Sequence, residues 1–129
     1  MRMFLTGSQY IEWRWNLSDF FQEHRIDVFD SVEYPREYSS IFKYFRILEG
    51  CDGVIACFSK VEPQHLATVL EISYASKLGK EIMIVDEAQR KKSWIHCLPY
   101  STSFPNIEGL KEYLTKAVAS PKKYHQFFG

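Results

Sequence analysis

The side chain best suited to chemistry in this sequence is a lone carboxylate, Glu71, in the stretch 66–80. That stretch reads Leu-Ala-Thr-Val-Leu-Glu-Ile-Ser-Tyr-Ala-Ser-Lys-Leu-Gly-Lys, and it predicts one helix with mostly apolar or small residues around the acid. Residues three and four positions apart are neighbours on a helix, and none of those positions around Glu71 is basic. Glu71 is therefore either a badly placed surface residue or a working group, and we favour the second interpretation.

A glutamate carboxylate can attack a sugar carbon and form a glycosyl-enzyme intermediate, which divides one difficult displacement into two easier ones. Free glutamate is already ionised at neutral pH, so a nucleophile of this kind needs no activating base. As a purely structural group, a buried acid would need partners that the local sequence does not supply. We therefore expect Glu71 to be catalytic.

Four short segments predict the strands that must position this helix. Residues 53–58 and 81–85 are almost continuously apolar, as is typical of strands covered on both faces of a parallel sheet. Residues 3–6 and 26–29 predict two further strands. Residues 87–104 are read as one long irregular connection, of a length typical of a binding loop or lid.

Helical patterns alternate with these strands. One runs over 17–24 after Asn16 as N-cap, one from Ser39 or Ser40 to residue 49, and one from Asn106 as N-cap to residue 119; the Glu71 helix is stopped by Gly79. Alternation of strand and helix predicts a parallel sheet with helices on both faces. We expect residues 1–129 to form a single α/β domain with a flavodoxin-like or Rossmann-like parallel sheet of four or five strands.

Ligands of open parallel sheets bind beyond the carboxyl ends of the strands. A glycine there lets the backbone approach a ligand, and hydroxyl or acidic side chains can bind a sugar or give a proton to a leaving base. The substrate-binding candidates at these ends, or in the loop before the Glu71 helix, are Gly7, Ser8, Asp30, Ser59, His65 and Asp86. The glycine turn at 6–8 can equally be only a tight turn. No GxGxxG or P-loop motif is present.

Tyr10 and Trp13 follow the glycine turn in what the pattern predicts to be a loop. Aromatic side chains above a sheet edge can stack on a flat base, a contact of roughly 1–3 kcal/mol in nucleic-acid complexes. They can equally cover the end of the sheet as part of the core. Both interpretations stay open for these two residues.

Composition excludes several classes of function. The formal charge is zero at neutral pH, whereas binding of polymeric nucleic acid requires a basic excess. Three cysteines are an odd number without metal-ligand spacing, so we expect reduced thiols and no metal site. The sequence shows no stretch long enough to span a membrane and no signal peptide. We expect a cytoplasmic protein that acts on a small molecule.

Three segments together resemble the nucleoside 2-deoxyribosyltransferase family and related nucleotide N-glycosidases. Residues 4–8 look like the opening strand and glycine turn, residues 51–59 like the segment with an acid before an apolar strand, and residues 68–80 like the glutamate helix. The resemblance implies that Glu71 is the nucleophile, that no cofactor is needed, and that a homo-oligomer shares parts of each site. Where the family commonly has an acid about two helical turns before Cys51, this chain has Tyr44 and Phe45.

The function hypothesis is a nucleoside or nucleotide deoxyribosyltransferase, or an N-glycoside hydrolase, in which Glu71 displaces the base and a second base or water captures the sugar. Asp30, Asp86 or His65 could protonate the base. One alternative is a TIR-like NAD glycohydrolase, which shares the sheet and a helix glutamate. The other is a catalytically inactive nucleotide-binding or scaffold protein, which the missing family acid at Tyr44 favours.

Overall fold

The computed structural model describes residues 1–7, 11–31, 40–58, 66–87 and 98–119. In this part of the chain, five parallel strands form one sheet in the order β2-β1-β3-β4-β5. The strands are β1 (Arg2–Gly7), β2 (Asp27–Asp30), β3 (Gly53–Phe58), β4 (Glu81–Asp86) and β5 (Thr102–Phe104). This is the flavodoxin-like strand order, so the predicted α/β architecture is confirmed.

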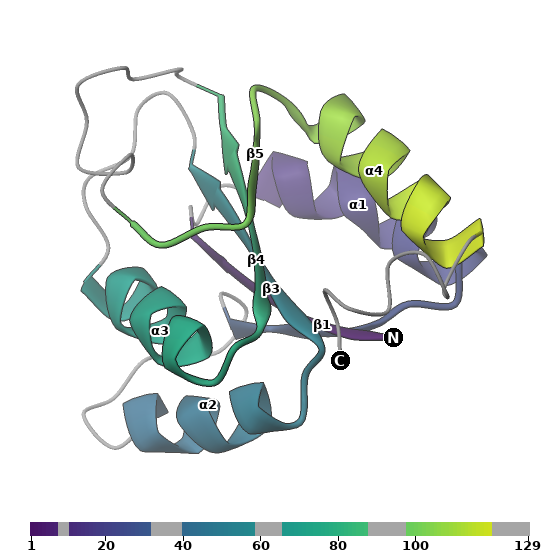
Figure 1. The fold of residues 1–129 in the computed structure, drawn as a ribbon. Coiled ribbons are helices and arrows are strands. Elements are labelled where there is room, and N and C mark those ends of the chain that lie inside the picture. The colour runs from purple at the N-terminus through teal and green to yellow at the C-terminus, as the bar shows by residue number, and fades with distance from the viewer. Residues whose placement is uncertain (8–10, 32–39, 59–65, 88–97, 120–129) are drawn as a thin grey trace.

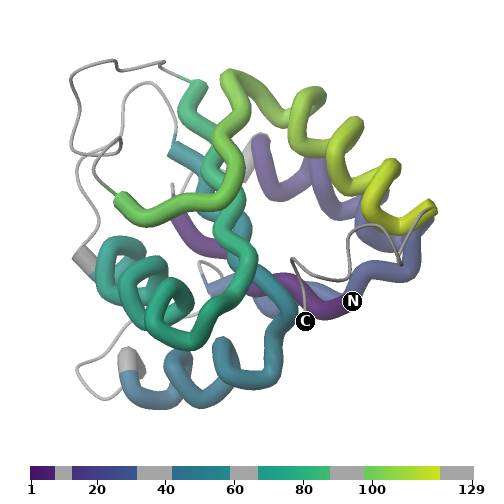
Figure 2. The backbone as a smooth tube through the Cα atoms, in the orientation of Figure 1, coloured from purple at the N-terminus to yellow at the C-terminus, as the bar shows by residue number. Residues whose placement is uncertain are grey.

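Helices cover both faces of the sheet, as Figure 1 shows. Helices α1 (Ile11–Glu23) and α4 (Ile107–Ala119) lie on one face, and α2 (Ser40–Glu49) and α3 (Leu66–Lys77) lie on the other. The backbone trace in Figure 2 shows the same layers, with α2 beside α3 and α1 beside α4. The core is correspondingly divided into two apolar clusters that the sheet separates.

Side-chain alternation along β1 decides which residues meet which helices. Met3 and Leu5 pack in the cluster under α1 and α4, whereas Phe4 packs in the cluster under α2 and α3. Successive side chains of a strand point to opposite faces. Thr6, the residue after Leu5, therefore points toward α2 and α3, and it is fully buried.

Helix α1 begins at Ile11, so the predicted start near residue 17 is wrong. Asn16, expected as the N-cap, is an exposed residue inside the helix. The apolar face that holds the helix on the sheet begins at Trp13 and continues through Leu17 and Phe21, at helical spacing. Packing of this longer face makes the helix begin about 1.7 turns before the predicted start.

Strand β5 lies in the segment predicted to be irregular. Its three residues, Thr-Ser-Phe, carry no apolar run that would mark a strand. The strand forms because it pairs with the edge of β4, with Met83 opposite Thr102 and a hydrogen bond from Ser101 N to Ile82 O of 2.8 Å. Tertiary pairing, rather than local propensity, makes this element.

Two predicted helix signals are confirmed. The side chain of Asn106 accepts a hydrogen bond from Gly109 N at 2.8 Å, which is the expected N-cap of α4. Gly79 has φ of 73° and ends α3 in a Schellman motif, with Gly79 N bonded to Ser76 O and Lys80 N to Ala75 O. The same motif ends α1, but there the left-handed residue is Arg25, with φ of 54°.

Candidate functional site

Glu71 is fully buried on α3 and is held by a partner from the sheet. The hydroxyl of Thr6 donates a hydrogen bond to Oε1 of Glu71 over 2.8 Å. The two residues are 65 positions apart in the sequence, which is why the local pattern around Glu71 shows no partner. The carboxylate is therefore a placed group and not a surface residue.

A second hydroxyl completes this buried polar cluster. Thr68 lies one helical turn before Glu71 on α3, and its Oγ1 is 3.0 Å from Oγ1 of Thr6. Thr68 is 1% exposed, and both Thr6 and Glu71 are 0% exposed. Three polar side chains thus form a connected group beside the apolar cluster under α2 and α3.

The cluster lies at the point of the sheet where ligands of this fold bind. β1 leads into α1 on one face, and its neighbour β3 leads into α3 on the other. The chain therefore leaves these two neighbouring strands toward opposite faces of the sheet, which is the topological switch point at which doubly wound sheets bind ligands. Thr6 is the penultimate residue of β1. Glu71 is thus anchored beside this switch point.

Gly7 is required by the packing of β1 on β3. Its φ is 116°, and a Cβ atom at this position would lie 2.1 Å from the carbonyl oxygen of Cys57. The sequence suggested that the backbone at Gly7 closely approaches a ligand. In the structure, Gly7 closely approaches the backbone of the neighbouring strand β3. Contact between Gly7 and a substrate stays a prediction.

The two acids at strand ends lie on opposite faces of the sheet. Asp86 follows Ile82 and Ile84 on β4 at alternating positions, so it shares the α2 and α3 face with Glu71, and it is 3% exposed. Asp30 lies on the other face, where its Oδ2 is 3.4 Å from Nε of Arg14 on α1. Of these two candidates, the structure brings only Asp86 to the face of Glu71.

Trp13 is a helical residue, so its expected place in a loop is wrong. Its side chain lies on α1, is 4% exposed and packs with Leu17 and Phe21 in the cluster under α1 and α4. The core interpretation, which the sequence left open, describes this packing. The remaining candidates, Ser8, Tyr10, Ser59 and His65, lie outside the described residues.

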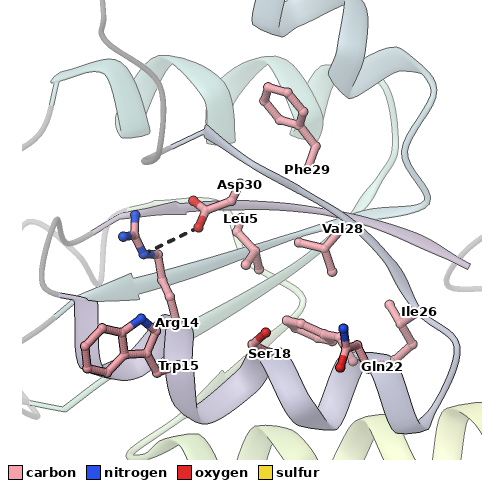
Figure 3. A pocket seen from close by; sticks show the side chains of 10 residues that line it. Leu5, Arg14, Trp15, Ser18, Gln22, Ile26, Val28, Phe29 and Asp30 are labelled. Carbon is pink, nitrogen blue, oxygen red and sulfur yellow. Dashed lines mark ion pairs between the residues drawn. The ribbon is translucent and has the colours of Figure 1, made fainter.

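A pocket that the sequence did not indicate lies between α1 and the edge strand β2. It has a volume of about 320 Å³. Figure 3 shows its apolar wall, which includes Leu5 and Val28, and the ion pair of Arg14 with Asp30 at one end. The polar residues of its α1 side, Arg14, Ser18 and Gln22, recur every fourth position, a signal hidden by the late predicted start of the helix. The pocket is on the sheet face opposite Glu71.

Cys57 can be excluded as a nucleophile although it lies beside the same strand ends. Burial raises the pKa of its thiol well above 9.0, and the carboxylates of Glu87 and Asp30 raise it further. The thiolate is the nucleophilic form of cysteine, so this side chain is inert near neutral pH. Cys51 and Cys57 are both free thiols.

No cluster of His, Cys, Asp or Glu with the geometry of a metal site occurs among the described residues. None of the helices in this part of the chain is long and apolar enough to cross a membrane.

Comparison with known proteins gives a likeness in structure alone. No protein-family model and no curated protein matches the sequence. Among solved structures, the chain is similar to the Clostridium botulinum CMP N-glycosidase BcmB, with a TM-score of 0.65 and 18% sequence identity over 90% of this chain and 98% of that one. At this identity the likeness establishes the fold. The structural neighbour is a CMP N-glycosidase, an enzyme that acts on a nucleotide.

Proposed function

We propose that this protein cleaves the bond between base and sugar in a nucleoside or nucleotide, with Glu71 as the nucleophile. The observation that carries the proposal is the placement of Glu71: a fully buried carboxylate, bonded to Thr6 at the carboxyl end of β1, beside the topological switch point between β1 and β3. The structural likeness to a CMP N-glycosidase supports it.

In the first step, a carboxylate oxygen of Glu71 attacks the anomeric carbon, and the bond from that carbon to the base nitrogen breaks. The base leaves with the electron pair and takes up a proton, while the sugar stays as an ester on Glu71. In the second step, water or a second base attacks the same carbon, loses a proton and releases the Glu71 carboxylate. Water gives a hydrolase and a base gives a transferase.

Asp86 is the better placed of the two strand-end acids to give the proton to the leaving base. It shares the sheet face of Glu71, whereas Asp30 lies on the opposite face next to Arg14. A neutral leaving base departs far more readily than an anionic one, and positioned acids of this kind typically contribute about 10²–10⁴-fold.

The test incubates the protein separately with CMP, dCMP, cytidine, deoxycytidine and NAD. Chromatography measures the free base that is released from each substrate. We expect base release from the nucleotides or nucleosides, and a loss on the order of 10⁴-fold or more in Glu71→Gln, since removal of a nucleophile costs this much in well-studied enzymes. Glu112→Gln is the matched control, because this acid is 74% exposed on α4, remote from the cluster.

Quenched reactions should also contain protein heavier by one sugar phosphate or sugar, with the added mass on the peptide that carries Glu71. Full activity in Glu71→Gln would refute the mechanism. Release of nicotinamide from NAD alone would instead identify a TIR-like NAD glycohydrolase. Thermal stabilisation by nucleotides without any turnover would identify an inactive binding protein.

A further inference from the structure

The proposed reaction assigns no role to the two buried hydroxyls beside Glu71, those of Thr6 and Thr68. Thr6 and Thr68 come from different elements, a central strand and a helix of the layer above it, and their oxygens meet inside the apolar core. A buried polar group is costly unless it is hydrogen-bonded. Apolar side chains of the same shape, such as valine, would avoid this cost at both positions. The hydroxyls therefore call for a functional explanation.

The distances fix the direction of the hydrogen bonds when Glu71 is ionised. A carboxylate only accepts, and a threonine hydroxyl has one proton. The proton of Thr6 is used in the 2.8 Å bond to Oε1 of Glu71. The 3.0 Å contact between the two hydroxyls must then be a bond from Thr68 to Thr6. The three side chains form a directed chain, Thr68 to Thr6 to Glu71.

All three members of this hydrogen-bonded chain lie in a strand or a helix. Thr6 is flanked by residues that pair with β3, Leu5 opposite Ile55 and Gly7 opposite Cys57. Thr68 belongs to the same helix as Glu71, and both lie on its buried side. The chain therefore ties the glutamate helix to the central strand at the level of the carboxylate. Hydrogen bonds in such a chain polarise and strengthen one another where water is excluded.

We propose that Thr68 and Thr6 are a positioning relay: Thr6 orients the Glu71 carboxylate and favours its ionised form, and Thr68 acts through Thr6. This inference rests on the proposed function. Its distinctive consequence is an order of effects. Loss of the Thr6 hydroxyl disconnects Thr68 as well, so the Thr68 hydroxyl contributes nothing once Thr6 is gone.

The experiment compares Thr6→Val, Thr68→Val and the double variant, with Thr6→Ser and Thr68→Ser as rescues, on the substrate that the wild type cleaves best. We expect Thr6→Val to lower kcat by about 10- to 100-fold with KM changed less than about threefold, as for a hydrogen bond to a charged group. Thr68→Val should lower kcat less, by about 3- to 10-fold, and the double variant should match Thr6→Val. Each serine variant should lie near the wild type.

Two further measurements distinguish a positioning role of Thr6 from a purely structural one. The acidic limb of the pH profile of kcat should move to higher pH in Thr6→Val, because the lost donor favoured the charged carboxylate. Thr115→Val is the matched control: its hydroxyl bonds to Lys111 O at 2.8 Å on the exposed side of α4, and activity should not change.

The relay is refuted if Thr6→Val keeps kcat within twofold of the wild type while Glu71→Gln is inactive, an outcome that leaves the proposed function standing. It is also refuted if the losses in the double variant multiply, because independent contributions would then act on Glu71. If the wild type releases no base from any substrate, the proposed function fails and the relay fails with it.

Discussion

Replacing Gly7 with alanine is expected to destabilise the protein much more than replacing Gly79, although both glycines have positive φ. At Gly79, φ is 73° and nothing lies within 4 Å of the position of an added Cβ. An L-residue in the left-handed region costs about 1–2 kcal/mol, and loss of glycine's extra freedom in the unfolded chain returns roughly 0.5–1 kcal/mol. Gly79→Ala should therefore cost about 1 kcal/mol.

At Gly7, a steric clash with β3 adds to the cost of the positive φ. The new Cβ would lie 2.1 Å from Cys57 O, 2.8 Å from Cys57 N and 2.9 Å from Cys57 C, all of them backbone atoms of β3. No side chain can rotate away, so the two strands must separate by about 0.9 Å to restore a 3.0 Å contact. Backbone strain of about 1–3 kcal/mol and one weakened buried hydrogen bond of about 1–3 kcal/mol give a total of roughly 2–6 kcal/mol.

Thermal melts of the two variants and of Gly109→Ala measure these terms. At about 2.1 cal/mol/K of unfolding entropy per residue, 1 kcal/mol corresponds to roughly 4 °C in a chain of this size, so Tm should fall by about 8–24 °C for Gly7→Ala and about 4 °C for Gly79→Ala. Gly109 is helical, with no contact shorter than 3.4 Å for an added Cβ, so Gly109→Ala should raise Tm slightly. Equal losses at Gly7 and Gly79 would refute the steric argument.

Three further predictions concern stability and reactivity. Burial raises the pKa of Glu81 above its ordinary 4.5, although hydrogen bonds from Ser101 and Tyr113 lower it. The folded protein therefore holds this proton more tightly than the unfolded chain, and its stability falls as pH rises from 4.5 through the folded pKa. Glu81→Gln should raise Tm at pH 7 but not at pH 4, and an unchanged Tm at pH 7 would contradict this reasoning. Arg25→Gly should raise the free energy of unfolding by about 0.5–1 kcal/mol in urea, because Arg25 is the left-handed residue after α1 with φ of 54°; a loss of stability would contradict it. Cys57 should resist iodoacetamide at pH 8 in the folded protein and react only when it is unfolded, as peptide mass spectrometry can show, since its thiol pKa is raised well above 9.0.

The predictions that succeeded from sequence were those that depend on neighbouring residues. The continuous apolar character of β3 and β4, the Asn106 N-cap and the Gly79 helix stop each record a local requirement of burial or of backbone conformation. The predictions that failed depended on distant residues. β5 exists because β4 offers an edge, and α1 reaches back to Ile11 because Trp13 packs on the sheet.

The same division applies to the candidate site. The sequence alone singled out Glu71, because a lone acid in an apolar helical pattern is visible without any structure. It could not show that Thr6 bonds to this acid, that Asp86 shares its face while Asp30 does not, or that Gly7 is held against Cys57. These facts depend on strand order and register, which bring together residues far apart in the chain. Local periodicity determines which side chains are buried, and only the pairing of strands decides which of them meet.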